Sequence, residues 1–327
     1  IHLGLNDTDP RNWPNYNSHF DRDYQQLINS FRQANPKVKI WICLLTPIFH
    51  PHPRFESGTR DWHAAIQKHI RRIAEANQTG LIDLHTPLYS RPDLFADALH
   101  PNAEGAAIMA KTIYAALTGN NGGLKLASLY SDGMVMQRQQ PIVFRGTANA
   151  GTQVKVAFNG QRQTCTAAAD GHWKAIFPAM EAGGPYEAQI RTKGERRDLH
   201  LIYIGEVWLC SGQSNMEFPV KATTTATEDL AHADQHPLLH LYNMPTRFPT
   251  NAEKWPKAVL DSVNRLALLD TKGWQVASKA AVASFSAVAY HFGKALADSL
   301  KVPVGIICNA VGGTTTESWI DRHTLEW

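Results

Sequence analysis

Residues 210–218 read Cys-Ser-Gly-Gln-Ser-Asn-Met-Glu-Phe, and they follow an apolar run at 202–209. This run is short and rich in β-branched and aromatic residues, which predicts a buried strand. An α/β enzyme places its nucleophile at the carboxyl end of a central strand, so Ser214 is the candidate nucleophile. Gly212 gives the turn room, and the amides after the strand can face a developing oxyanion. The plainer alternative is a turn that only ends the strand.

The composition is that of an ordinary globular protein, with 43% hydrophobic and 19% charged residues among 327. A chain of this length predicts two compact domains with sizeable cores. The net charge of +3 is too small to indicate a nucleic-acid surface, and no long Lys/Arg run occurs. No apolar run reaches the length of a membrane span. We therefore expect neither a nucleic acid nor a membrane as partner.

The four cysteines, at positions 43, 165, 210 and 308, lie in or beside strand-like runs and include no C-x-x-C pair. Buried free thiols are the prediction, since cysteine is among the residues most often found inside proteins.

Residues 1–4 already have the pattern of a strand in the middle of a domain. We therefore expect the native start, and any signal peptide, to lie upstream.

Residues 1–118 alternate between strand and helix patterns. The predicted strands cover 1–5, 38–45 and 81–84, and the predicted helices cover 19–34, 61–77 and 102–117. Such alternation predicts a parallel sheet with helices on both faces.

The pattern changes after Asn120-Asn121-Gly122-Gly123, which is predicted to be a linker. Residues 124–200 lack a helix-length pattern and show short strands, predicted at 142–146, 154–158, 173–177 and 186–190. Asn159-Gly160 and Asp170-Gly171 fall between strands and suit tight hairpin turns. The segment is therefore predicted to be a small antiparallel β-sandwich.

From residue 201 the α/β character returns. A strand ends at 209, an irregular stretch continues to about 283, a helix covers 285–300 and a strand covers 304–308. The predicted organisation is thus α/β at 1–120, a β-sandwich at 124–200 and α/β again at 201–327.

Asp97-Ala98-Leu99-His100-Pro101 lies between the last predicted strand and the last helix of the first region. Asp97 and His100, three residues apart in one loop, can supply a base and its orienting carboxylate to a serine nucleophile. The alternative is chance, because Asp-x-x-His pairs are frequent.

Two further loops follow strands. Asn6, in Gly4-Leu5-Asn6-Asp7, can aim its side-chain amide at an acyl oxygen, although Asn-Asp after a strand is also a good turn or cap. Gly312-Gly313-Thr314 can offer backbone amides to the same oxygen, although Gly-Gly at a strand end is commonly just a turn.

The string Gly-Gln-Ser-Asn-Met resembles the first sequence block of the SGNH esterases, in the version carried by sialate O-acetylesterases and related carbohydrate acetylesterases. Gly312-Gly313-Thr314, followed by Glu317-Ser318-Trp319, resembles the second block, and Asn6 and Asp97–His100 resemble the third and last blocks. The resemblance implies an SGNH-type, flavodoxin-like parallel sheet. It also implies a triad of Ser214, His100 and Asp97, with an oxyanion hole from the Ser214 and Gly313 amides and the Asn6 side chain. Gly312 is the alternative glycine, and no metal or organic cofactor is implied.

The resemblance to the acetylesterases covers about 124–327, while 1–118 is similar to the carboxyl half of a GDSL-type esterase domain. Here the sequence departs from the family, because the amino-terminal part has the third and last blocks but no nucleophile block, and the carboxyl part has the first and second blocks but no Asp-x-x-His of its own. Either the chain is cut from a longer protein inside two esterase domains, or its two α/β parts make one composite, circularly permuted domain. We predict the composite domain, within one chain or in a homodimer that exchanges halves.

The predicted function is removal of O-acetyl groups from carbohydrates by a secreted or periplasmic esterase. Acetylated plant polysaccharide such as acetylxylan is the predicted substrate, because no arginine clamp for a sialate carboxylate is identifiable. The alternative within the enzyme class is a sialate O-acetylesterase. The alternative of another class is a carbohydrate-binding or inactive fragment of a longer two-esterase protein.

Overall fold

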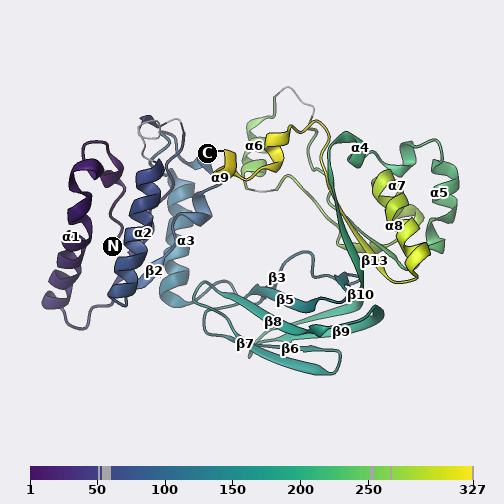
Figure 1. The fold of residues 1–327 in the computed structure, drawn as a ribbon, viewed down its shortest axis with the longest axis horizontal. Coiled ribbons are helices and arrows are strands. Elements are labelled where there is room, and N and C mark those ends of the chain that lie inside the picture. Colours follow the sequence, from purple (N-terminus) through teal and green to yellow (C-terminus); the bar gives the residue numbers. More distant parts are fainter. Residues whose placement is uncertain (51, 54–59, 251–253, 266, 326–327) are drawn as a thin grey trace. The chain divides into compact units, whose positions relative to one another are not determined.

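The structure is a computed structural model that describes residues 1–50, 52–53, 60–250, 254–265 and 267–325 (Figure 1). The chain divides into two units, Ile1–Thr118 and Gly119–Trp327, so the division falls beside the predicted linker. Both units combine helices and strands, which makes this an α/β protein with mixed sheets. Among the described helices, none is both long enough and apolar enough to cross a membrane.

In its described residues the first unit contains three α-helices of four turns or more and a short parallel strand pair. Its elements are η1 (Asn6–Thr8), α1 (Trp13–Ala34), β1 (Trp41–Cys43), α2 (Arg60–Ala76), β2 (Gly80–Ile82), η3 (Thr86–Leu88), η4 (Pro92–Leu94) and α3 (Ala103–Thr118).

The core of this unit forms where helix α2 covers strand β1. Ile66 and Ile70 recur at helical spacing on α2, and both are fully buried against Ile42 of β1. The predicted strand at 1–5 is wrong, because only Ile1 bonds to β1, with the Cys43 amide donating to its carbonyl over 2.8 Å. The chain then turns at Gly4, whose φ of 120° few other residues adopt, and enters η1.

The second unit contains most of the strands. Its elements are β3 (Lys125–Leu126), β4 (Val135–Gln137), β5 (Pro141–Thr147), β6 (Gln153–Phe158), β7 (Gln161–Thr166), β8 (His172–Ala179), β9 (Gly183–Arg191), β10 (Arg196–Gly212), α4 (Ser214–Glu217), η5 (Val220–Ala222), α5 (Ala226–His232), η6 (Ala233–Gln235), β11 (Leu239–Asn243), α6 (Lys257–Asn264), β12 (Trp274–Val276), α7 (Lys279–Ala283), α8 (Ala287–Leu300), β13 (Val304–Ala310), η7 (Thr316–Trp319) and α9 (Arg322–Leu325).

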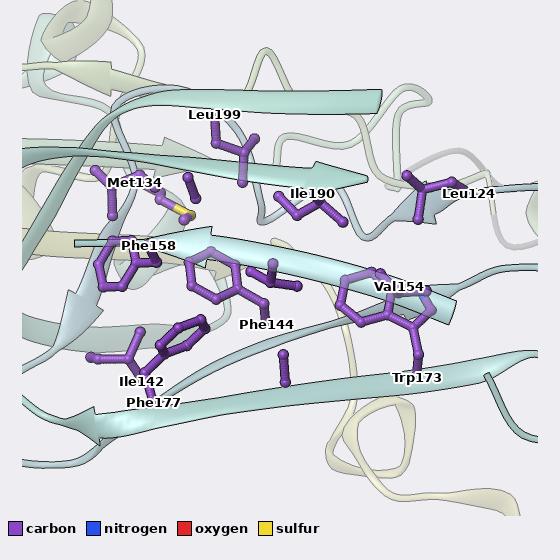
Figure 2. Packing of buried hydrophobic residues seen from close by; sticks show 14 of the residues in the cluster. Leu124, Met134, Ile142, Phe144, Val154, Phe158, Trp173, Phe177, Ile190 and Leu199 are labelled. Carbon is purple, nitrogen blue, oxygen red and sulfur yellow. The ribbon is translucent and has the colours of Figure 1, made fainter. Parts of the chain in front are cut away.

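Two sets of antiparallel strands share one apolar core in this unit. Strands β3, β5 and β8 form one sheet, and β7, β6, β9 and the start of β10 form part of another. Figure 2 shows Phe144, Phe158 and Phe177 meeting between these strands, with ring centroids 5.3–5.9 Å apart in edge-on pairs. Edge-on aromatic pairs stabilise a core beyond the area that they bury, so this cluster joins the two sheets.

The two predicted hairpin turns have different outcomes. Asn159-Gly160 joins β6 to β7, which pair from Gln153 opposite Thr166 to Phe158 opposite Gln161. Both turn residues have positive φ, 45° and 71°, as a two-residue hairpin requires, so this prediction is confirmed. Asp170-Gly171 is not a hairpin turn, because β7 pairs with β6 whereas β8 pairs with β5 in the other sheet.

Strand β10 connects the antiparallel part of this unit to its parallel part. Its first half pairs antiparallel with β9, and its second half, residues 206–212, pairs parallel with β13. Strand β11 lies on the far side of β13, also parallel to it, and α7 and α8 lie on one side of these strands (Figure 1). The predicted boundary between 200 and 201 therefore falls inside a single strand.

The predicted irregular stretch up to 283 is wrong in part, because it contains strand β11. Leu239, Leu241 and Tyr242 of this strand are buried. The strand was not predicted from the sequence because the polar residue His240 interrupts its apolar residues. In the fold His240 is fully buried, and its Nδ1–H donates to the Gly133 carbonyl over 2.8 Å. A buried hydrogen bond of this kind allows a histidine to occupy a core strand.

The burial of His240 predicts a loss of stability in acid. Burial lowers its pKa to about 4, from an ordinary value of 6.5. Between these values the unfolded chain binds more protons than the folded one, so stability falls as the pH drops from 6.5 to 4. We expect this residue to remove about 3 kcal/mol of unfolding free energy over that range, measured by urea unfolding.

The His240→Asn variant is the control for this pH dependence. Its amide nitrogen can replace Nδ1 as donor to Gly133, but it does not titrate. The variant should show a smaller change in unfolding free energy between pH 7 and pH 4 than the parent. An equal change in both proteins would contradict the assignment.

Candidate active site

Ser214 lies at the carboxyl end of a long central strand, as its sequence context predicts. Strand β10 ends at Gly212, and Ser214 is the first residue of the single-turn helix α4 that follows (Figure 1). Ser214 is exposed to solvent. A backbone amide at the first position of a helix has no acceptor within that helix, so it is free to face an anion.

The loop after β13 lies directly against Ser214. The Val311 amide donates to the Gly212 carbonyl over 2.9 Å, and the Gly312 amide donates to Glu217 Oε2 over 2.8 Å. A side chain at Gly312 would start 2.4 Å from Glu217 Oε2 and 3.7 Å from Ser214 Cα, so it would displace the Glu217 carboxylate. Two loops that the sequence places about one hundred residues apart are thus in contact.

Of the two candidate glycines, Gly313 has the amide that remains available. The Gly312 amide is occupied by Glu217, whereas the Gly313 amide has no hydrogen-bond acceptor among the described residues. Gly313 has a φ of 77°, a left-handed conformation that favours glycine. This arrangement favours Gly313 over Gly312 as an oxyanion donor.

A cavity of about 410 Å³ opens beside Ser214 at the carboxyl ends of β10, β11 and β13. It is lined by Ser214, Glu217, Phe218, Pro219, Lys221, Asn243, Pro245, Ser284, Ser286, Cys308 and Ala310. Ligands of open α/β sheets bind at the carboxyl ends of the strands, so both its position and its size suit a small acyl or sugar group.

Cys308 is a second nucleophilic atom in this wall, opposite Cys210 on the neighbouring strand. Both thiols are free and buried, as predicted, whereas Cys165 is free but only partly buried, so the prediction of burial is wrong for that residue. Burial raises the pKa of Cys308 to about 11. A thiol that stays protonated at neutral pH is a poor nucleophile, so Cys308 is a weaker candidate than Ser214.

Asp97 and His100 form a hydrogen-bonded pair in the first unit. His100 Nδ1 lies 2.6 Å from Asp97 Oδ2, and the amides of His100 and Leu99 donate to Oδ1 over 2.7 and 3.0 Å. These hydrogen bonds, above all the one from the His100 ring, hold the pKa of Asp97 well below its usual range. A carboxylate on Nδ1 leaves Nε2 as the basic nitrogen, which is the tautomer that a general base needs.

The loop that carries this pair is held in an uncommon conformation. Ala98 has a φ of 61°, although it is not glycine. It is buried, its amide donates to the Phe95 carbonyl, and its own carbonyl accepts from Phe49 over 2.9 Å. Such a backbone costs about 1–2 kcal/mol and persists only where the surroundings enforce it, often at functional sites.

Asn6 begins η1 and is exposed. Its backbone carbonyl accepts from the Asn12 side chain over 2.9 Å, which fixes the turn. Beside it, Asp9 is held by a two-pronged ion pair with Arg11. The Asn6 side chain is therefore presented by an ordered turn.

The structure thus brings together two groups of the predicted residues. Ser214, Gly312 and Gly313 meet in the second unit, and Asp97 pairs with His100 in the first. The pairing of Ser214 with His100 stays a prediction.

Glu217 was missed by the sequence reasoning, although it stands inside the quoted stretch. It follows Ser214 by three residues, and residues at that spacing share a helix face, which was an available signal. Asn243 was missed because its strand, β11, was missed. Thr250, whose hydroxyl donates to the Gly312 carbonyl over 2.6 Å, carries no local signal at all.

Comparison with known proteins gives consistent matches. Residues 1–108 match the GDSL-like lipase/acylhydrolase family. The chain is 28% identical over 219 residues to the sialate O-acetylesterase of Pongo abelii, covering 62% of this chain and 40% of the relative. It is 33% identical over 138 residues to the acetylxylan esterase of Xylanibacter ruminicola, covering 36% of this chain and 28% of the relative.

A solved structure agrees with these relatives. The fold matches a carbohydrate acetylesterase from Xanthomonas citri with a TM-score of 0.53 and 32% identity, covering 62% of this chain and 44% of that one. The chain spans at most about 40% of the length of these two curated relatives. Residues 1–108 are therefore similar to the GDSL-like lipase/acylhydrolase family, and the chain is similar in sequence to sialate O-acetylesterases and to an acetylxylan esterase.

Proposed function

We propose that this protein is a serine esterase that removes O-acetyl groups from carbohydrates. The observation that carries the proposal is the position of Ser214, at the end of β10, beside a cavity and next to a glycine loop with an available amide. The names of the relatives, all acetylesterases, support the same chemistry.

In the proposed mechanism, His100 takes the proton from Ser214 as the Oγ atom attacks the acetyl carbonyl carbon. The Ser214 and Gly313 amides and the Asn6 side chain stabilise the negative oxygen of the tetrahedral intermediate. His100 then returns the proton to the departing sugar oxygen, leaving an acetyl group on Ser214. Water, deprotonated by the same imidazole, attacks the acetyl carbon; the bond to Ser214 Oγ breaks, the imidazolium returns the proton to Oγ, and acetate leaves. Asp97 stabilises the imidazolium in both steps.

We propose that Asp97 and His100 act on Ser214, within one chain or in a homodimer that exchanges halves. Each unit holds what the other lacks, and a serine without a base is nearly inert at neutral pH. The parts at 1–120 and 201–327 would then form one SGNH-type parallel sheet with helices on both faces, and 124–200 an accessory β-sandwich. The alternative is that the two parts belong to separate esterase domains.

The free edge of β10 supports completion of the sheet by further strands. Residues 206–212 pair with β13 on one edge, and no described strand pairs with their other edge. Trp208 and Leu209 on this segment are 44% and 64% exposed. Natural proteins rarely leave an apolar strand edge uncovered, because such edges aggregate.

Acetylated plant polysaccharide such as acetylxylan is the substrate that we propose. The cavity wall is largely apolar, with Phe218, Pro219 and Pro245, and it contains no arginine among its lining residues. A sialate ester would bring a carboxylate, which an arginine would hold in a two-pronged pair. Lys221 also lines the cavity, however, and its charge keeps a sialate ester as the second candidate.

Acetate release from the two substrates decides between them. The expected result is a higher kcat/KM on acetylxylan than on an O-acetylated sialoside at equal acetyl concentration. Lys221→Gln should then leave the acetylxylan rate within about threefold of the parent, because a neutral substrate gains little from a cation. Faster turnover of the sialoside, lost in this variant and at high salt, would assign the sialate activity instead.

The alternative of another class is a protein that binds carbohydrate without cleaving it. Such a protein would migrate more slowly through a gel that contains acetylxylan, as affinity electrophoresis measures, and it would release no acetate. A polymeric substrate is met outside the cytoplasm, so we propose a secreted or periplasmic location. Fractionation of the source cells with an antibody tests this location.

A further inference from the structure

The glycine loop beside Ser214 is held from two sides by residues without an assigned role. Glu217 Oε2 accepts from the Gly312 amide over 2.8 Å. On the other side of the same residue, Thr250 Oγ1 donates to the Gly312 carbonyl over 2.6 Å. Both polar groups of the Gly312 backbone are therefore engaged by side chains.

These two contacts determine the direction of the Gly313 amide. The Gly312 carbonyl and the Gly313 N–H belong to one planar trans peptide unit, so they point in opposite directions. Since Thr250 holds the carbonyl, the N–H is directed away from Thr250. Glu217 holds the preceding peptide unit, which prevents the loop from rotating about Gly312 as a whole.

Glycine makes this restraint necessary. Gly312 and Gly313 have no Cβ, and Gly313 already lies at a φ of 77°, so the pair has more accessible backbone conformations than other residues. An oxyanion donor is effective only when it points in advance at the position where charge develops. A flexible pair of glycines would lose this advantage unless neighbouring groups held it.

We propose that Glu217 and Thr250 are positioning residues that aim the Gly313 N–H at the oxyanion. The inference rests on the proposed esterase function and deepens it. Glu217 also connects α4 to the glycine loop, because it lies on the same helical turn as Ser214 and accepts a hydrogen bond from the Gly312 amide. The carboxylate acts as a hydrogen-bond acceptor in this role, and its charge is not required.

The test is a set of variants assayed on 4-nitrophenyl acetate. Glu217→Ala should lower kcat about 10–100-fold and change KM by less than about threefold, since losing an oxyanion donor outright costs about 10²–10³ in kcat. Glu217→Gln keeps an acceptor oxygen and should recover kcat to within about fivefold of the parent. Glu228→Ala, an exposed glutamate of α5, is the matched control and should leave both constants unchanged.

Thr250 provides an independent pair of variants. Thr250→Val keeps the shape and removes the hydroxyl, so kcat should fall about tenfold, while Thr250→Ser should restore it. This pair decides the question if Glu217→Ala fails to fold, which thermal unfolding of each variant would reveal.

Three results would overturn the inference. The first is unchanged kcat in Glu217→Ala and Thr250→Val. The second is equal damage in Glu217→Gln and Glu217→Ala, which would show that the charge is what matters. The third is higher activity in Glu217→Ala, which would mean that Glu217 blocks Gly312. An inactive parent protein would instead refute the proposed esterase function itself.

Discussion

Ser214→Ala is expected to lower kcat/KM for an acetyl ester by about 10³-fold or more. In the proposed mechanism the Ser214 hydroxyl attacks the carbonyl, so the variant lacks the nucleophile. Cys308, another nucleophilic group in the cavity wall, is a poor substitute, because burial raises its pKa to about 11 and keeps the thiol protonated at neutral pH. Initial rates of acetate release by parent and variant measure this effect.

A serine-directed fluorophosphonate provides a second readout for the same residue. It should label Ser214 in the parent protein and leave the Ser214→Ala variant unlabelled, as read by mass spectrometry of the digested protein. Ser286→Ala is the matched control, because Ser286 lines the same cavity but is 2% exposed and bonded to Ala289. Labelling of another serine, with Ser214→Ala still active, would remove Ser214 from the mechanism.

His100→Ala is expected to lower kcat/KM about 10²–10⁴-fold, the usual contribution of a general base. Asp97→Asn should also lower it, because the amide leaves the imidazole in the wrong tautomer. Both residues are exposed, so neither change should lower the melting temperature appreciably. Activity that survives both changes would mean that Ser214 uses a different base.

Mixing two inactive variants distinguishes one composite chain from exchanged halves. If halves are exchanged in a homodimer, Ser214→Ala mixed with His100→Ala and refolded together should regain activity, because one site receives intact residues from both chains. If each chain builds its own site, the mixture should stay inactive while the parent is active. Sedimentation of the parent protein gives the oligomeric state independently.

Local patterns predicted much of the secondary structure. The helices at 61–77 and 102–117 were predicted within one residue or so of α2 and α3, because apolar residues recur at helical spacing. Asn159-Gly160 predicted its hairpin because few other pairs adopt positive φ twice in succession. The Asp97–His100 hydrogen bond connects residues three apart in one loop.

The pairing of strands that are far apart in the sequence could not be predicted from local patterns. Asp170-Gly171 has the same turn chemistry as Asn159-Gly160, yet it connects strands of different sheets. A dipeptide specifies the local direction of the backbone, whereas the partner of a strand depends on every other strand that competes for that edge. The apolar run of β11 was hidden for a related reason, since only burial in the fold makes His240 part of a core.

The sequence by itself determined the strand that ends before Ser214, the glycines beside it and the Asp97–His100 loop. Each depends on sterics and hydrogen bonds between residues a few positions apart. Only the tertiary structure decided that the Gly312 amide donates to Glu217, 95 residues away, and is thereby unavailable to another acceptor. The physical reason is that parallel strands β10 and β13 must pair before their ends, and the side chains on them, can meet.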